Sequence, residues 1–312
     1  MKALVVGCGS IGKRHIRNLC KVREIDYIYV FSSIKNCAKE FTGAGKTVEQ
    51  VSSIDNTDAD IALICNNTSR HIESALVLAG QGIDLFIEKP LSHNLKNIDK
   101  LRTLARKNKI KTFLAYNMRF LGAIELVKKT VKSGAIGRLF FSRIEAGQYL
   151  PSWRPGTDYR KSYSASSSLG GGVDLDLSHE IDYMRYIFGE PRNWQVVKAK
   201  VSKLEISSND IFEGIYTYNN GPVTSVHLDY LAVRPNRKLL ITGEKGAIEC
   251  DFIAKTIKIK GKVYKNRTLF DMPLTYEKEL NHFIKAVKSN GKLLTTLDDG
   301  IAALKLIGAK NV

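Results

Sequence analysis

Cysteine is scarce in this sequence, and the few cysteines present are not spaced to bind metal or to build a disulfide framework. Five occur among 312 residues, at positions 8, 20, 37, 65 and 250. An odd number argues against a complete set of disulfides, and no two have the C-x-x-C spacing of a zinc site. We therefore expect a protein of a reducing compartment, the cytoplasm, with no metal site.

Long apolar runs are also missing. No stretch reaches the roughly 20 residues that a bilayer span needs. The N-terminal MKALVVGCGS has a short apolar run that ends in glycines and no small-residue cleavage site, which is typical of a buried strand rather than a signal peptide. With 44% hydrophobic and 25% charged residues, the chain has the composition of a globular protein long enough for two domains.

Acidic residues are outnumbered, 31 against 48 basic ones, which leaves a formal charge of +17. Such a charge favours anionic partners, whether nucleic acid, an anionic membrane or small molecules. The basic residues are spread along the chain, and no basic helix, basic arm or nucleic-acid motif stands out. This distribution favours phosphorylated small ligands and argues against nucleic acid or a membrane as partners.

The first 118 residues alternate short β-branched runs with amphipathic helical stretches. The expected strands are 3–6, 27–31, 61–65, 85–87 and 112–115, and the expected helices are 11–22, 69–79 and 95–108. Strands that alternate with helices predict a parallel sheet covered on both faces. Residues 1–118 are therefore expected to form an α/β domain.

In residues 119–312 the expected helices and strands no longer alternate. The expected elements are a helix at 124–132, a strand at 138–149, a polar and aromatic loop at 150–168, a single helix at 173–188, consecutive strands over 194–262 and two helices at 276–288 and 299–307. Consecutive strands without helices predict an antiparallel sheet, so this second domain is expected to be α+β.

A complete G-x-G-x-x-G follows the first expected strand and opens a helical pattern. Gly7 permits the tight turn, Gly9 allows a pyrophosphate to approach the backbone, and Gly12 lets the helix pack on the strand. The N–H groups of this turn, including those of Ser10 and Ile11, can then bind the pyrophosphate at the positive end of the helix. The alternative is a glycine turn without a ligand.

No carboxylate follows the second expected strand. An NAD enzyme usually has Asp or Glu there to accept hydrogen bonds from the ribose 2′-hydroxyl. This chain has Ser32, Ser33 and Lys35 instead, which suit a 2′-phosphate. The pattern favours NADP over NAD, unless Lys35 is an ordinary solvated residue, in which case NAD stays open.

Further motifs extend over nearly the whole chain. They are Asn66–His71, Glu88-Lys89-Pro90 after the fourth expected strand, Tyr116–Phe120, and Gly170–Gly172 followed by His179–Asp182. Together with the glycine turn, and in this order, they resemble the Gfo/Idh/MocA oxidoreductase family, which includes glucose–fructose oxidoreductase and inositol dehydrogenase. The resemblance implies a Rossmann domain and a second domain with a large open, mainly antiparallel sheet that mediates assembly, here into a homodimer or homotetramer.

The resemblance also implies roles for individual residues. It implies that Lys89 serves in catalysis next to a peptide to Pro90 that can be cis, and that His179 faces the reacting carbon. Other positions matching the cofactor-lining motifs are Asn66, Thr68, His71, Glu88, Lys89 and Asn117. Residues 66–67 are Asn-Asn where the family commonly has Thr-Pro, a variation that the loop can tolerate.

The chemistry suits these residue types. Moving hydride from an alcohol to nicotinamide requires an acceptor for the hydroxyl proton; a histidine can take it, and a lysine can hydrogen-bond the same oxygen. The alternatives without a catalytic role are that Lys89 is a surface lysine and that His179 is a histidine packed in a helix. The family usually has an aspartate four residues before the histidine, where this chain has Leu175.

Three aspartates compete for the missing role. In a continuous helix from residue 173, Asp176 lies about 60° from His179 around the axis and Asp174 about 140° away. We therefore expect Asp176 to be the catalytic carboxylate. Asp182, three residues beyond His179, could orient the imidazole instead.

The expected substrate is a sugar, whether unmodified, phosphorylated or linked to a nucleotide, with its ring hydroxyl or ketone as the reacting group. Aromatic side chains stack on sugar faces, and arginines bind phosphate or carboxylate. The candidates for these contacts are Arg119, Trp153, Arg154, Tyr159 and Arg160. Three alternatives stay open: the loop is ordinary surface, the substrate is another carbonyl compound such as a dihydrodiol or tetrapyrrole, or the protein is a non-catalytic ligand sensor.

Overall fold

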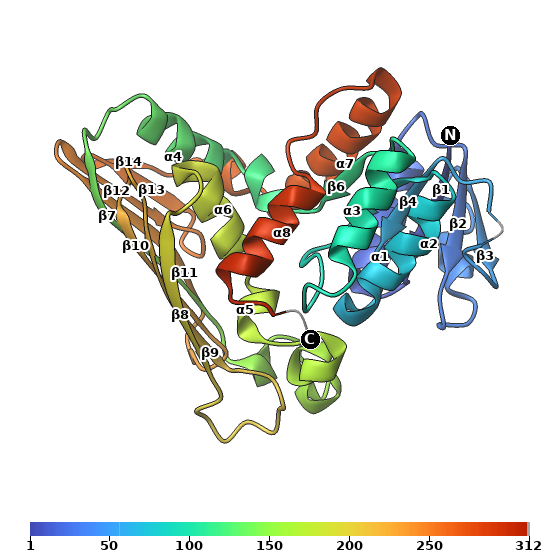
Figure 1. Cartoon of the computed structure of the whole chain (residues 1–312), viewed down its shortest axis with the longest axis horizontal. Helices are drawn as coiled ribbons and strands as arrows, with labels where there is room; N and C mark the ends of the chain where they lie inside the picture. Colours follow the sequence, from blue (N-terminus) through green and yellow to red (C-terminus); the bar gives the residue numbers. More distant parts are fainter. Residues whose placement is uncertain (56, 311–312) are drawn as a thin grey trace. The chain divides into compact units, whose positions relative to one another are not determined.

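The computed structural model describes residues 1–55 and 57–310, and these form two compact units (Figure 1). Unit 1 contains residues 1–116, 276–304 and 309–310, and unit 2 contains residues 117–275 and 305–308. Residues 276–304, which were expected in the second domain, thus group with the first. No helix in the described part of the chain is long and apolar enough to cross a membrane.

Unit 1 is built on a six-stranded parallel sheet in the order β3-β2-β1-β4-β5-β6. The strands are β1 (Lys2–Val6), β2 (Tyr27–Phe31), β3 (Thr47–Val51), β4 (Ile61–Ile64), β5 (Asp84–Ile87) and β6 (Thr112–Leu114). The central strands are apolar and buried, as a sheet covered on both faces requires. The sequence analysis missed β3, because this edge strand is half polar and has no buried residue.

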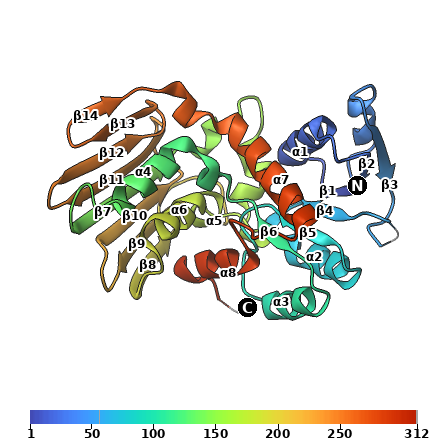
Figure 2. The same cartoon turned by 90° about the horizontal axis from the view of Figure 1, so that it is seen from above.

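Helices cover both faces of this sheet. They are α1 (Ser10–Lys21), α2 (His71–Gly80), α3 (Ile98–Lys107) and most of α7 (Met272–Ser289). Figure 2 shows α1 and α7 on one face and α2 and α3 on the other. Helix α7 is bound there by Phe283, whose ring lies 5.6 Å from that of Phe86 and 5.9 Å from that of Phe113. This apolar contact explains why a segment near the C-terminus belongs to unit 1. Helix α8 (Leu297–Leu306) follows.

Unit 2 is built on an eight-stranded sheet in the order β14-β13-β12-β11-β7-β10-β9-β8. The strands are β7 (Leu139–Gly147), β8 (Asn193–Ala199), β9 (Ile211–Thr217), β10 (Val223–Asp229), β11 (Asn236–Gly243), β12 (Gly246–Asp251), β13 (Thr256–Ile259) and β14 (Lys262–Tyr264). Only β7 and β10 pair in parallel; the other pairs are antiparallel. The parallel Rossmann sheet and this mainly antiparallel sheet confirm the predicted fold class.

One face of the unit 2 sheet is covered by α4 (Gly122–Lys132) and α6 (His179–Phe188), and Figure 1 shows no helix over the other. Strand side chains alternate accordingly, with Phe212 and Val226 buried and Phe141, Ile215 and Val223 about half exposed.

The single helix expected at 173–188 is in fact two. A four-residue helix α5 (Val173–Asp176) ends at Leu177, and α6 begins at His179. Hydrogen bonds three residues apart, from Ser178 N to Leu175 O and from Glu180 N to Leu177 O, join the two. The prediction of a continuous helix was wrong. The angles of 60° and 140° derived from it therefore do not apply, and tertiary contacts decide where each aspartate points.

Candidate cofactor and catalytic site

The glycine turn connects β1 to α1, and each of its glycines meets a different requirement. Gly7 has a φ of +103°, and its N–H donates to the carbonyl of Phe31 over 2.8 Å. A Cβ on Gly12 would lie 2.0 Å from the carbonyl oxygen of Gly7, whereas a Cβ on Gly9 would meet nothing within 4 Å. Gly7 and Gly12 are thus required by the backbone and its packing. Gly9 faces open space, where a ligand can approach.

The N-terminus of α1 is suited to an anion. Gly9 caps the helix without a side-chain hydrogen bond, and the first turn contains no acidic residue. The first intrahelical bond runs from Lys13 N to Gly9 O, so the N–H groups of Ser10, Ile11 and Gly12 have no acceptor within the helix. These groups and the helix dipole could hold a pyrophosphate.

The loop after β2 is held in shape by Gln50, a residue of β3 that the sequence analysis missed. The Gln50 amide donates to the carbonyls of Ser32 (3.2 Å) and Ile34 (2.9 Å). The hydroxyl of Ser32 accepts from Ile34 N, while Ser33 and Lys35 are exposed. The loop therefore presents hydroxyls and an ammonium group on a fixed backbone.

The loop after β4 and the start of α2 are tied together by polar contacts. His71 is buried, with Nδ1 2.9 Å from the carbonyl of Pro90 and Nε2 3.0 Å from that of Asn66. The Asn66 amide donates to Ser74, and Thr68 is buried. Burial lowers the pKa of His71. Because both ring nitrogens contact backbone, His71 would support a cofactor site through these loops rather than by direct contact.

Glu88 and Lys89 follow β5, at the sheet edge where the glycine turn follows β1. Glu88 Oε1 lies 2.7 Å from His15 Nε2, and Glu88 Oε2 accepts the backbone N–H of Lys89 over 3.2 Å. The Lys89–Pro90 peptide is cis. The sequence analysis did not single out His15. The one available signal was its place on the buried face of α1, beside Gly12, Ile16 and Leu19.

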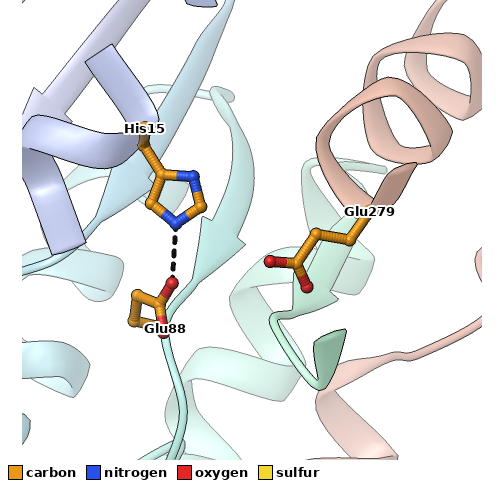
Figure 3. A group of neighbouring side chains, drawn as sticks. All are labelled: His15, Glu88 and Glu279. Atoms are coloured by element: carbon orange, nitrogen blue, oxygen red, sulfur yellow. Dashed lines mark hydrogen bonds and ion pairs between the residues drawn. The ribbon is translucent and has the colours of Figure 1, made fainter. Parts of the chain in front are cut away.

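Glu279 of α7 completes a buried group with these two residues, and Figure 3 shows its carboxylate directed toward them. Each residue offers one atom within 4.8 Å of the others. Ligands around a tetrahedral zinc ion stand about 3.3 Å apart. The 2.7 Å between His15 and Glu88 is instead a hydrogen-bond distance. The geometry thus favours a hydrogen-bonded pair beside a buried acid over a metal site.

Glu279 is expected to make the stability of the protein depend on pH. It is fully buried, and neither carboxylate oxygen has a hydrogen-bond partner within the described residues. Burial, and secondly Glu88, raise its pKa well above the ordinary value. The folded state then holds this proton more tightly than the unfolded chain does. Above the unfolded pKa of about 4.3, stability falls by about 1.4 kcal/mol per pH unit until the folded pKa is reached.

Glu279→Gln removes this loss, so the free energy of unfolding of the variant minus that of the parent should increase as the pH rises above the unfolded pKa of glutamate. Urea unfolding at several pH values measures this difference in free energy of unfolding. Burying the glutamine amide adds a contribution that does not depend on pH, so it does not affect the slope of the difference against pH. Glu277→Gln is the matched control, because Glu277 lies on the same helix in a surface ion pair with Lys21 (2.7 Å). Parallel pH curves for Glu279→Gln and the parent would contradict the prediction.

In unit 2, the candidate aspartates have separate partners. The ammonium of Lys198 lies 2.6 Å from Asp174 Oδ2. The Tyr230 hydroxyl donates to Asp176 Oδ2 over 2.6 Å. Asp176 is also the main cause that raises the pKa of Tyr163. Asp174 is thus half of an ion pair, whereas Asp176 accepts a hydrogen bond from a neutral phenol.

Asp182 and Arg119 pair with each other inside unit 2. The guanidinium nitrogens Nε and Nη2 of Arg119 lie 2.9 and 2.6 Å from the carboxylate oxygens of Asp182, and both side chains are buried. Asn117 is buried as well and donates to the Thr275 hydroxyl over 2.8 Å. These contacts, all within unit 2, hold residues 117–119 against α6 and the first turn of α7.

The aromatic loop after β7 brings three of its four candidate residues together. Trp153, Arg154 and Tyr159 line one small cavity of about 10 Å³, room for about one water molecule. The Trp153 ring packs edge-on against Tyr230, with centroids 5.2 Å apart. Arg160 is not part of this lining, because its guanidinium bonds Asp158 and Glu205 at the surface.

Comparison with known proteins agrees with this architecture. Residues 1–116 match the model of an oxidoreductase family with an NAD-binding Rossmann fold, and residues 124–249 match the GFO/IDH/MocA C-terminal domain. The chain is 28% identical to myo-inositol 2-dehydrogenase of Thermotoga maritima, over 98% of this chain and 94% of that protein.

Two solved structures share the fold. The WlbA dehydrogenase of Bordetella pertussis, in complex with NADH and UDP-GlcNAcA, has a TM-score of 0.85 at 17% identity and covers 98% of this chain and 94% of that one. Levoglucosan dehydrogenase in complex with NADH also has a TM-score of 0.85, at 21% identity, over 98% and 95%. The family matches confirm the resemblance of the sequence motifs. The chain therefore belongs to the Gfo/Idh/MocA oxidoreductase family, with an NAD(P)-binding Rossmann domain followed by the C-terminal domain of that family.

Proposed function

We propose that this protein is a dehydrogenase or reductase that moves hydride between a nicotinamide cofactor and a ring hydroxyl or ketone of a sugar or nucleotide-linked sugar. The observation that carries the proposal is the open, acid-free glycine turn at the same sheet edge as Lys89. The names of the relatives, myo-inositol 2-dehydrogenase and levoglucosan dehydrogenase, support a sugar as substrate.

In this proposal, the N–H groups of Ser10, Ile11 and Gly12 bind the pyrophosphate of the cofactor, and the bound nicotinamide accepts or donates the hydride. His179 takes the proton of the substrate hydroxyl, and Lys89 hydrogen-bonds the same oxygen. Asp176 is the supporting carboxylate. Trp153, Arg154 and Tyr159 contact the substrate, and their cavity must widen to admit a sugar.

A panel of oxidations tests the proposal. The protein is mixed with NAD⁺ or NADP⁺ and with myo-inositol, levoglucosan or UDP-linked sugars, and the absorbance of reduced nicotinamide is followed. The expected result is turnover of a sugar, with a kcat that Lys89→Met lowers by about a hundredfold or more. Turnover of a dihydrodiol alone would move the substrate to another class. Cofactor and sugar binding by calorimetry, without turnover in either direction, would show a sensor.

The choice of cofactor is proposed to be NADP. Nothing acidic lies in the segment Ser32–Asn36 after β2, and Lys35 is exposed there. We expect NADPH to bind more tightly than NADH in a fluorescence titration at fixed salt, and Lys35→Glu to reverse the order by repelling the 2′-phosphate. Lys39→Glu, an equal change of charge at an exposed site nearby, should shift the affinities less. Equal or tighter binding of NADH by the parent would contradict the preference.

Assembly is part of the same proposal. The sheet face of unit 2 without a helix carries half-exposed Phe141, Ile215 and Val223. Burial of such apolar side chains favours association. We propose that this face joins copies of the chain into a homodimer or homotetramer.

A further inference from the structure

We propose that two buried histidines, His15 and His71, are positioning residues that grip the backbone on either side of Lys89. This inference rests on the catalytic role proposed above for Lys89. The two side chains come from α1 and α2, which cover opposite faces of the unit 1 sheet (Figure 2). Each contacts a residue adjacent to the lysine.

His15 acts on the backbone of Lys89 through Glu88. The His15 ring is fully buried, and its Nε2 lies 2.7 Å from Glu88 Oε1 (Figure 3). The second oxygen of the same carboxylate accepts the backbone N–H of Lys89 over 3.2 Å. The imidazole therefore orients the carboxylate, and the carboxylate holds the peptide nitrogen of the lysine.

His71 acts on the backbone after Lys89 through Pro90. His71 Nδ1 lies 2.9 Å from the Pro90 carbonyl, and Nε2 lies 3.0 Å from the carbonyl of Asn66. Because burial lowers the pKa of His71, the neutral ring has one N–H, which donates to one of these two carbonyls while the other carbonyl only contacts the ring. Through the two contacts the ring lies between the segment after Lys89 and the loop after β4. That loop passes next to the glycine turn, because a Cβ on Gly7 would lie 2.7 Å from Asn66 N.

Residues 88–90 need these side-chain contacts because they lie beyond the end of β5 and make no further strand pairing. Glu88 N still bonds the Ile64 carbonyl in the manner of the strand, but β5 ends at Ile87. Side-chain contacts hold the segment after this point. A displacement of about 1 Å at a reacting group can cost about a hundredfold in rate. Two rigid rings at the flanking residues restrict Lys89 without occupying its ammonium group.

Chemical labelling of Lys89 tests this inference without a known substrate. The full chain is treated briefly with an acetylating succinimidyl ester at fixed pH, and the acetylation rate of Lys89 is read by peptide mass spectrometry. Lys89 is half buried in the parent. His15→Phe and His71→Phe keep a ring but lose the hydrogen bonds, so each should speed acetylation of Lys89 threefold or more. His15→Gln and His71→Gln, whose amides can still donate, should restore a slower rate.

His282→Phe is the matched control, because His282 is a half-buried histidine of unit 1 that accepts a hydrogen bond from Leu294 N. It should leave the rate at Lys89 unchanged. Circular dichroism identifies any variant that fails to fold, and the corresponding alanine variant, which also lacks the hydrogen bonds, then takes its place. Unchanged labelling in the folded phenylalanine or alanine variants, or equal acceleration by His282→Phe, would overturn the inference. Faster labelling in a protein that oxidises no sugar would leave it standing and overturn the proposed function instead.

Discussion

Lys89→Met is expected to lower kcat by about a hundredfold or more, the scale of a lost proton-transfer or hydrogen-bonding group, while cofactor affinity stays nearly intact. Methionine keeps the length of the side chain but has neither its charge nor its protons. The pyrophosphate would still bind to backbone N–H groups of the glycine turn, which the substitution does not touch. The readouts are kcat with a sugar from the panel and cofactor titration by fluorescence.

Lys96→Met is the control for this variant, because Lys96 is exposed a few residues further along the chain. Its kcat should equal that of the parent. An unchanged kcat in Lys89→Met would show that Lys89 has no catalytic role. A collapse of cofactor affinity would make Lys89 a binding or structural residue.

Asp176→Asn is expected to lower kcat substantially more than Asp174→Asn, by about tenfold or more. Both substitutions keep the size of the side chain and remove one charge. Asp176 bonds the phenol of Tyr230, whose ring packs against Trp153 of the candidate substrate loop. Asp174 pairs with Lys198 near the end of β8, so Asp174→Asn breaks an ion pair and does not touch the candidate substrate loop. Steady-state kinetics of the two variants on one sugar measures the difference.

Stability should respond in the opposite order. Asp174→Asn leaves Lys198 without its carboxylate, at a cost of about 1 to 2 kcal/mol, since Lys198 keeps about a third of its exposure and solvent screens it. The double variant Asp174→Asn/Lys198→Met should recover most of that loss in urea unfolding. If Asp174→Asn instead has the larger effect on kcat, Asp174 is the catalytic carboxylate.

The glycine turn and the central strands of unit 1 could be predicted because their signals are local. A buried parallel strand needs a continuous apolar run, and the turn after β1 needs glycine where a Cβ would strike the backbone. Residues within a short stretch of sequence meet both requirements. The edge strand β3 has no such signal. It pairs with β2 alone, and its residues are about half polar with none buried, so the sequence there has no continuous apolar run.

The aspartates show where local reasoning was insufficient. A helical pattern over 173–188 predicts one helix, and the two-residue break before His179 leaves no mark in the hydrophobic pattern. Asp174, Asp176 and Asp182 are similar in sequence but have different partners, Lys198, Tyr230 and Arg119. Each partner comes from a distant segment, so no spacing rule could assign them.

The sequence by itself determined the class of the protein, because the order and spacing of short motifs specify a Rossmann turn and the residues after its strands. Only the tertiary structure decided which side chains support them. His15, His71 and Glu279 come from three helices, and their contacts with one another or with Glu88 and Pro90 exist only when the sheet brings its strand ends together. Buried polar groups must find partners wherever the chain brings them, and those partners are set by packing rather than by neighbours in sequence.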